Sequence, residues 1–554
     1  MPVLLALPAW LAAAPSHPPV PGRLVFRGVT VVDVVAGRLL RNRSVTIDHG
    51  RILAVDSGPH AVAPGTQVVD AAGRYLIPGL WDMHVHLAAF PIDQRGADTR
   101  LESNADWALP LFLAHGVTGV RDMGGPFDVL HRWKSEVLLG ERVGPRIVHT
   151  GWKLGGRMPA YPTAPAPVRT VADASRAVTL LADAGADFVK VEVLPLPELK
   201  AVIQAAHARG LPVLGHLARS VSIWDASTAG MAGVEHLQQV LLGCSSRERW
   251  ILWRERFSGG RLAELLQRAG LLQVEAFREA TRGALVDSWD SVRATALVAH
   301  LRDHGTAQTP TLVAIQDWER LAPTLSAERA GWLPPNLLAQ DAKVYRGAIP
   351  PSPRKLATWE VERRTVRFMV RGGLPVLAGT DAPGNRRLPG ASLQEELELF
   401  VGSGLTPLEA LRSATLWPAE VLEIADSAGS VAPGRVADLV LLSANPLADI
   451  RALRQVEGVV AAGRYYARAA LDDQLAGVRA LLHEMRQAGP TLQLAVTIDD
   501  ENDRERGTLR PPGTDGTGSV VLRPATQLDL EGTHPEDAPP AKLAPLTGHL
   551  PLRK

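Results

Sequence analysis

Cysteine is almost absent from this chain, because among 554 residues the one thiol belongs to Cys244. A single cysteine excludes an intramolecular disulfide framework and any zinc site built from several cysteines. An excess of one charge is missing too, since 59 Lys and Arg stand against 58 Asp and Glu and leave a formal net charge of +1. This balance gives no indication of nucleic acid or an anionic membrane surface as a partner.

Apolar runs long enough to cross a bilayer are also missing, and no membrane span is predicted. The apolar run Val3–Ala14 is too short to span but fits the core of a secretory signal, and Ala12–Ala14 offers a cleavage site. No Lys or Arg precedes the run. We expect residues 1–22 to be a leader of a periplasmic or secreted protein. The alternative is an apolar N-terminus on a cytoplasmic one.

The two ends of the chain contain short strand-like runs separated by Gly and Asp. They begin with Leu24–Asp33, and the pattern returns at Ala437–Leu442 and Val456–Gly463. These runs predict a small composite β-sandwich domain made from residues 23–75 and 429–470. Residues 471–554 read as a C-terminal extension, with a helix at 472–487 and a Pro- and Gly-rich part that we expect to be largely disordered after about 505.

Residues 76–428 alternate between apolar strand-like runs and segments of helical period, which predicts an α/β fold with βα units closed into a (β/α)8 TIM barrel. Residues 241–305 are predicted to be a helical insertion containing Trp250, Trp253 and Trp289. The candidate strands are Leu76–Leu87, Val117–Met123, Arg146–Thr150, Phe188–Val193, Pro212–Leu217, Gly233–Leu237, Thr309–Ile315 and Pro375–Asp381.

Metal-binding residue types stand at the ends of several of these strands, where TIM barrels carry their catalytic groups. Side chains alternate along a strand, so His84 and His86 share one face and can reach the same ion. One strand-end histidine alone is more often structural, but a series in order along one set of βα units favours a site for zinc or a related cation. The series is His84, His86, Lys190, His216, His236 and Asp381. The other histidines considered lack this support and are predicted to be structural or surface residues: His115, His149, His207, His300 and His304.

Longer motifs extend the pattern. The sequence Pro78-Gly-Leu-Trp-Asp-Met-His-Val-His86 is followed by Gly116-Val-Thr-Gly-Val-Arg-Asp122, Gly379-Thr-Asp-Ala382 and Gly434-Arg-Val-Ala-Asp-Leu439. Together these motifs resemble the amidohydrolase superfamily over about Leu24 to Arg468. Within it the chain is similar to the branch of imidazolonepropionase-like proteins and metal-dependent Xaa-Pro dipeptidases.

The resemblance implies a role for each residue of the series. His84, His86 and Asp381 would hold the more buried of two Zn²⁺ or other divalent ions, and His216 and His236 the second. Lys190, carboxylated by CO2, would bridge them. Glu192 shares the strand face of Lys190 and remains an alternative bridging carboxylate. If Lys190 is only an ion-pair partner, the site would hold one metal.

The implied chemistry is attack by a metal-activated water, with Asp381 as general base and His236 near the scissile carbonyl. Dipeptidase relatives usually carry Gly-Gly-His in the loop after the third strand, where this chain has Gly155-Gly156-Arg157. Lys153 and Arg157 are therefore candidates to bind a substrate carboxylate, the alternative being solvated loop charges.

Three functions stay open. The leading one is hydrolysis of an amide in a small peptide or N-acyl amino acid. The second is opening or deamination of a cyclic amide or nitrogen heterocycle. The third is a non-catalytic binding protein on the same scaffold. A homo-oligomer is possible in each case.

Overall fold

The computed structural model describes residues 22–487, apart from gaps at 59–60, 89–100, 157–166, most of 259–282, 320, 322–323, 346–350 and 385. The chain divides into a unit at Met1–Leu494 and a second at Ala495–Lys554, and all described residues belong to the first. The predicted leader, apart from its last residue, and the predicted disordered tail therefore lie outside the described residues.

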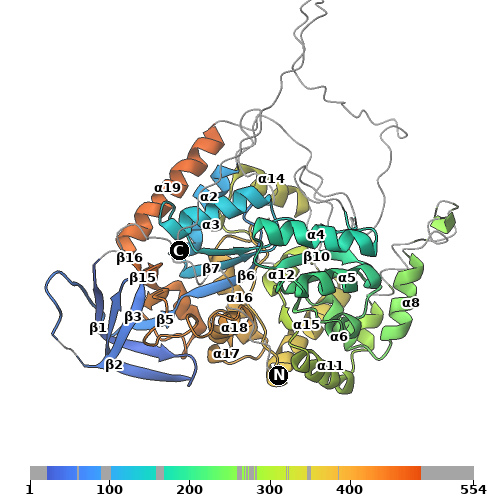
Figure 1. The fold of residues 1–554 in the computed structure, drawn as a ribbon, viewed down its shortest axis with the longest axis horizontal. Coiled ribbons are helices and arrows are strands. Elements are labelled where there is room, and N and C mark those ends of the chain that lie inside the picture. The colour runs from blue at the N-terminus through green and yellow to red at the C-terminus, as the bar shows by residue number, and fades with distance from the viewer. Residues whose placement is uncertain are drawn as a thin grey trace, which may run out of the picture. The chain divides into compact units, whose positions relative to one another are not determined.

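Strands from both ends of the chain pair in one sheet (Figure 1), in the order β16-β15-β14-β5-β1-β2-β3, with β4 parallel beside β1. The antiparallel pairing of β14 with β5 joins the late β-rich piece to the early one. These strands are β1 (Leu24–Asp33), β2 (Arg38–Asp48), β3 (Arg51–Ser57), β4 (Gln67–Asp70), β5 (Tyr75–Pro78), β14 (Leu439–Leu442), β15 (Val456–Ala461) and β16 (Arg464–Ala467).

This β-domain curls over its own core. Phe26 on β1 and Tyr465 on β16 have ring centroids 5.3 Å apart, although three strands lie between β1 and β16 in the sheet order. The core inside the curl contains Phe26, Ile47 and Leu439, all buried. The strands of the predicted β-sandwich therefore form one continuous hydrogen-bonded sheet, because β5 pairs with both β1 and β14.

The central domain contains two parallel sheets, β6-β7-β8 and β9-β10-β11-β12-β13. Parallel bridges join Val376 to Gln308 of β13 and Ala382 to Val85 of β6. This arrangement is consistent with a TIM-barrel-type domain, and closure of eight strands into one barrel stays a prediction. The strands are β6 (Leu80–Val85), β7 (Val117–Asp122), β8 (Arg146–His149), β9 (Leu154–Gly155), β10 (Val189–Leu194), β11 (Val213–Leu217), β12 (Gly233–Glu235) and β13 (Ala307–Thr309).

Three predicted strands differ from those in the structure. The run Leu76–Leu87 is two strands, because β5 belongs to the β-domain and β6 to the central domain, with the break at Gly79. The run Thr309–Ile315 is a strand only at its start, because a helix begins at Leu312. The run Pro375–Asp381 contains no named strand and only the bridge at Val376.

The helix at Leu312 forms where a strand was predicted because Glu396 stabilises its first turn. The carboxylate of Glu396 accepts the N–H groups of Leu312 at 2.8 Å and Val313 at 2.7 Å. The first N–H groups of a helix have no partner inside the helix, so a buried acceptor satisfies them. Glu396 lies 84 and 83 residues away along the chain, so local sequence patterns carry no sign of this contact.

Helices alternate with the parallel strands, and α19 follows the β-domain and packs beside α2 (Figure 1). The described part of the predicted insertion, residues 241–305, contains the end of α7 and all of α8 and α11. The helices are α2 (Glu102–Ala114), α3 (Phe127–Leu139), α4 (Val171–Ala184), α5 (Leu196–His207), α6 (Ile223–Thr228), α7 (Gln238–Gly243), α8 (Glu248–Ser258), α11 (Ser291–Asp303), α12 (Leu312–Trp318), α13 (Ala327–Ala330), α14 (Pro335–Val344), α15 (Pro353–Arg371), α16 (Ala391–Gly402), α17 (Pro407–Ser413), α18 (Leu416–Val421), the 3-10 helix η1 (Ile450–Arg454) and α19 (Arg468–Gln487).

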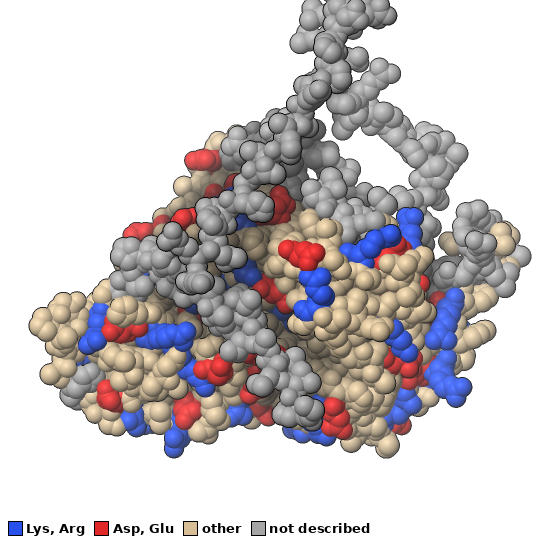
Figure 2. All heavy atoms as spheres, viewed as in Figure 1, with Lys and Arg blue, Asp and Glu red and all other residues tan. Residues whose placement is uncertain are grey.

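Two surface properties bear on partners. In the part of the chain that the structure describes, no helix combines the length and the apolar character needed to cross a bilayer. On the face shown in Figure 2, basic and acidic side chains are interspersed rather than gathered by sign. This distribution fits the near-zero net charge of the whole chain.

Substitution Gly79→Ala should destabilise the junction between the two domains. A Cβ at Gly79 would lie 1.9 Å from Oγ1 of the buried Thr118 on β7, and such overpacking costs about 1–3 kcal/mol. The matched control is Gly477→Ala on α19, where a Cβ meets no atom within 4 Å and a better helix former adds roughly 0.5–1 kcal/mol. Urea unfolding followed by fluorescence should shift to lower midpoints for the first variant and not for the second. Equal midpoints would contradict this packing.

Candidate metal centre

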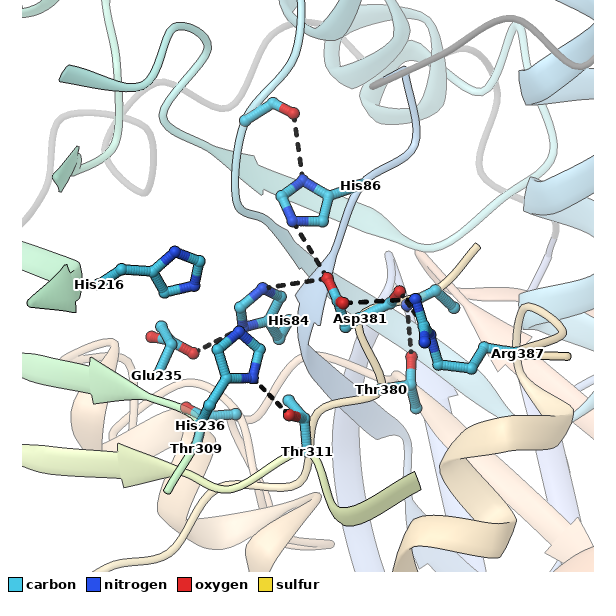
Figure 3. A network of polar contacts seen from close by, with 12 residues as sticks. His84, His86, His216, Glu235, His236, Thr309, Thr311, Thr380, Asp381 and Arg387 are labelled. Atoms are coloured by element: carbon cyan, nitrogen blue, oxygen red, sulfur yellow. Dashed lines mark hydrogen bonds and ion pairs between the residues drawn. The ribbon is translucent and has the colours of Figure 1, made fainter. Parts of the chain in front are cut away.

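Five of the six residues of the predicted series, all except Lys190, lie close together in Figure 3. His84 is on β6, with His86 just beyond it, His216 is on β11 and His236 follows β12. Asp381 follows the bridge at Val376. The donor atoms form two groups, each with its members within 4.8 Å of one another: His84, His86 and Asp381, and His84, His216 and His236. His84 therefore belongs to both groups.

Three of these histidines have their Nδ1 atoms engaged by neighbouring groups. His84 Nδ1 lies 2.8 Å from Glu235 Oε2, and His86 Nδ1 lies 3.2 Å from the carbonyl of Gly124. His236 Nδ1 lies 2.6 Å from Thr311 Oγ1. A carboxylate and a carbonyl only accept hydrogen bonds, so the Nδ1 atoms of His84 and His86 carry the proton. Their Nε2 atoms then hold the lone pair that a metal ligand needs.

Asp381 presents its two oxygens to different partners. Oδ1 lies 3.4 Å from His84 Nε2 and 3.2 Å from His86 Nε2, whereas Oδ2 lies 3.4 Å from Nη2 of Arg387. Arg387 also donates from Nε to the Asp381 carbonyl at 3.0 Å and from Nη1 to Asp317 at 2.9 Å. Burial opposes ionisation of Asp381, but Arg387 and the two histidines outweigh it and hold the pKa of this carboxyl well below its usual range.

Lys190 is fully buried on β10, and its Nζ lies 3.2 Å from His216 Nε2. Burial and the charge of Lys190 hold the pKa of His216 well below its ordinary value, so this imidazole is neutral at pH 7. Glu192, two residues along the strand, lies 3.3 Å from Nζ of Lys153. The lysine thus contacts the histidine cluster, and Glu192 contacts the loop residue that was predicted to bind substrate.

The chemistry of this donor set fits a divalent cation. Nε2 of His84 is buried and makes no geometrically acceptable hydrogen bond with any described residue. Burial lowers the pKa of His84, but Asp381 and Glu235 outweigh it and raise the pKa above its ordinary value. The surroundings of His84 therefore favour a positive charge, which a cation held by imidazole and carboxylate ligands supplies.

The backbone at these strand ends is strained. His236, Thr311 and Asp381 have φ values of 60°, 52° and 56°, and Val193 at the end of β10 has 55°. Left-handed conformations cost of order 1–3 kcal/mol for residues other than glycine, and they concentrate at functional sites. At His236 and Asp381 this conformation sets the direction of a candidate ligand. Strand alternation does not predict it.

Sequence reasoning assigned no role to Glu235, Arg121 or Arg387. Arg121 on β7 is buried, donates from Nη2 to Glu235 Oε1 at 2.8 Å and from Nε to the Met83 carbonyl at 2.7 Å. Burial opposes ionisation of Glu235, but Arg121 and His84 hold its pKa well below the usual range. The sequence offered one sign of this pair: Arg121 is a charged residue inside the strand-like run that forms β7, a pattern that indicates a buried ion pair.

Of the two residues predicted to bind substrate, Lys153 is described and Arg157 is not. Lys153 stands next to β9 and contacts Glu192. Arg157 lies outside the described residues. The histidines predicted to be structural join neither ligand group within the part of the chain that is described: His115, His149, His207, His300 and His304.

Comparison with known proteins connects this geometry to a family. A family model described as the amidohydrolase family matches residues 75–465. An adenine deaminase from Rubrobacter xylanophilus is 37% identical over 121 residues, which cover 20% of this chain and 19% of that protein. A dihydroorotase from Pelotomaculum thermopropionicum is 45% identical over 65 residues, 12% of this chain and 14% of that protein. The chain thus matches only about a fifth or less of the length of these curated relatives.

Solved structures share the fold over most of the chain. A bottromycin amidohydrolase superposes with a TM-score of 0.61 and 23% identity, covering 86% of this chain and 95% of that one. A Xaa-Pro dipeptidase with methionine bound in its active site gives a TM-score of 0.57 and 21% identity, covering 80% and 100%. At this level of identity the likeness establishes the fold.

Substitution Glu235→Gln should destabilise the protein strongly, because it leaves Arg121 buried without its counter-charge. Breaking a buried pair from one side costs about 3–5 kcal/mol, whereas replacing both partners with neutral side chains costs much less. Urea unfolding of E235Q, R121M and the double variant measures this coupling. The double variant should unfold at a higher urea concentration than E235Q. A double variant no more stable than E235Q would show that the two charges are not coupled.

Proposed function

Because the chain belongs to the amidohydrolase family, we propose that it hydrolyses the amide bond of a small peptide or an N-acyl amino acid at a two-metal site. Family membership implies a hydrolase that acts on carbon–nitrogen bonds and depends on a metal. The proposal adds two statements to what family membership implies: that the site holds two ions, and that the substrate is a small peptide or an N-acyl amino acid. His84, His86 and Asp381 would hold one ion, His216 and His236 the other, and Lys190 would bridge them.

The position of Lys190 is the main observation that supports a site for two ions. An ammonium cannot ligate a cation, yet this side chain is fully buried with its Nζ 3.2 Å from His216 Nε2. Reaction of the neutral amine with CO2 would form a C–N bond, release a proton and give a carbamate, an anionic group that could help to hold both ions. Glu192 is the weaker candidate for a bridge, because it lies 3.3 Å from the Lys153 ammonium.

The residues of the site support general acid–base catalysis of amide cleavage. Divalent cations bound at this centre would lower the pKa of a bound water from ~15.7 to about 7. Asp381 is held ionised beside Arg387, so its carboxylate can accept a proton from the attacking water and return it to the leaving nitrogen. His236, with Nδ1 in contact with Thr311, would use Nε2 to help hold the second ion, and that ion would supply the positive charge that stabilises the carbonyl oxygen as it becomes negative. Lys153 would bind a substrate carboxylate, as would Arg157.

A second candidate function is deamination or ring opening of a nitrogen heterocycle. The curated relatives named adenine deaminase and dihydroorotase favour it, although each match covers a fifth or less of the relative. Purified metal-loaded protein should be assayed with Xaa-Pro dipeptides, N-acyl amino acids, adenine and dihydroorotate. Release of an amino acid from the first two classes supports the proposal. The alternative is supported if ammonia is released from adenine, or the dihydroorotate ring opens, while the dipeptides and N-acyl amino acids are not cleaved.

Metal content tests the bridging role of Lys190. The parent protein should hold about two zinc-like ions per chain by elemental analysis, and a chelator should remove them and abolish turnover. Lys190→Met keeps the length of the side chain but removes the amine, so about one ion should remain. The matched control, Lys200→Met, changes an exposed lysine on α5 and should leave the metal content unchanged. Two ions in K190M would contradict the bridge.

Substitution Asp381→Asn should reduce kcat by about 10²–10⁴-fold, the usual contribution of a general base, because an amide cannot accept the proton. Asp473→Asn, at an exposed position on α19, is the matched control and should behave as the parent does. Steady-state kinetics on the best substrate and thermal unfolding separate lost chemistry from lost fold. A D381N variant that turns over at the parental rate would exclude Asp381 as the base.

A further inference from the structure

Trp318 is the last residue of α12, directly beside the candidate metal centre. The helix starts at a defined position, because Glu396 accepts the N–H groups of Leu312 and Val313. Thr311, one residue before the helix, contacts His236 Nδ1 at 2.6 Å. The same short segment therefore supports a candidate ligand at its beginning and carries the indole at its end.

The indole contacts one candidate ligand, His236, and Arg387, which is a neighbour of another candidate ligand. Its ring centroid lies 4.9 Å from that of His236, with the planes at 70°, so the two rings meet edge to face. The guanidinium of Arg387 lies 5.7 Å from the indole centroid, and Arg387 also bonds Asp381. Asp317, the neighbour of Trp318 in the chain, is held by Arg387 and by the hydroxyl of Tyr345 at 2.7 Å. These contacts hold the indole in place.

Much of this indole remains uncovered. Trp318 is 42% exposed, whereas Trp107 and Trp133 in the core are fully buried. An aromatic ring that is held rigidly beside reacting groups and left open is the usual lining of a small-molecule site. A bound amide near His236 would have the indole within reach of one of its side chains.

We propose that Trp318 is a specificity-determining residue that contacts a flat, apolar group of the substrate, an aromatic side chain above all. This inference rests on the proposed amide hydrolase function and adds a substrate class to it. Aromatic pairs contribute favourable energy beyond the area they bury.

The test compares matched aromatic and aliphatic substrates. For Phe-Pro against Ala-Pro, and for N-acetyl-Phe against N-acetyl-Ala, the parent should favour the aromatic member in kcat/KM. Trp318→Ala should reduce that preference about tenfold, and Trp318→Phe should keep most of it. Trp253→Ala is the matched control, because this Trp on α8 is 60% exposed and stacks on Phe257 away from the ligand groups. It should leave the preference unchanged.

A binding measurement separates this inference from the proposed function. The same pairs are titrated by calorimetry into metal-loaded D381N and into D381N/W318A, where turnover does not interfere. Tighter binding of the aromatic member to D381N, lost in the double variant, supports the role of Trp318 even if the parent cleaves no amide. A parent protein that cleaves no amide would overturn only the amide hydrolase function. An unchanged preference in W318A, equal binding of each pair, or no binding would overturn the inference.

Discussion

The ion pair between Glu235 and Arg121 is the interaction on which the geometry of the candidate metal centre depends. Both side chains are buried, and Glu235 also accepts the Nδ1 proton of His84. A buried carboxylate needs a compensating charge, and here the compensation comes from a different strand, β7. Because His84 belongs to both ligand groups, the orientation of one imidazole sets where the two groups meet. The pair thus ties β6, β7 and β12 together at their carboxyl ends.

A second buried carboxylate links the opposite edge of the centre. Asp82 on β6 accepts the N–H of Thr380 at 3.0 Å and its hydroxyl at 2.6 Å. It also lies 3.3 Å from the N–H of His84. Burial raises the pKa of Asp82 to about 7. These bonds hold the residue before Asp381 against β6, in a segment with no named strand of its own. The position of the candidate base therefore depends on a side chain rather than on a strand ladder.

The ligand types and their order could be predicted from the sequence because they follow from strand periodicity. His84 and His86 share a face by alternation. Lys190 lies inside a recognisable apolar run, and His216 and His236 stand near the ends of two others. The start of α12 could not be predicted, because Glu396 stabilises it from another helix. The left-handed backbone at His236 and Asp381 was equally inaccessible, since only the surrounding tertiary contacts compensate its cost. Whether Lys190 is carboxylated depends on bound ions and CO2, which are not encoded in local patterns.

Ligand positions and substrate contacts differ in how the fold holds them. The four candidate histidine ligands and Lys190 lie on or directly beyond parallel strands, where backbone hydrogen bonds define their spacing, whereas Asp381 is positioned through the contacts of Thr380 with Asp82. Trp318 lies farther out, at the end of a helix whose start is held by Glu396 and whose last turn is held through Asp317 and Arg387. Arg387 bonds the candidate base as well. A change in the position of Trp318 would therefore reach Asp381 through the side chain of Arg387, so the proposed roles of Trp318 in substrate selection and of Asp381 in proton transfer would be physically coupled.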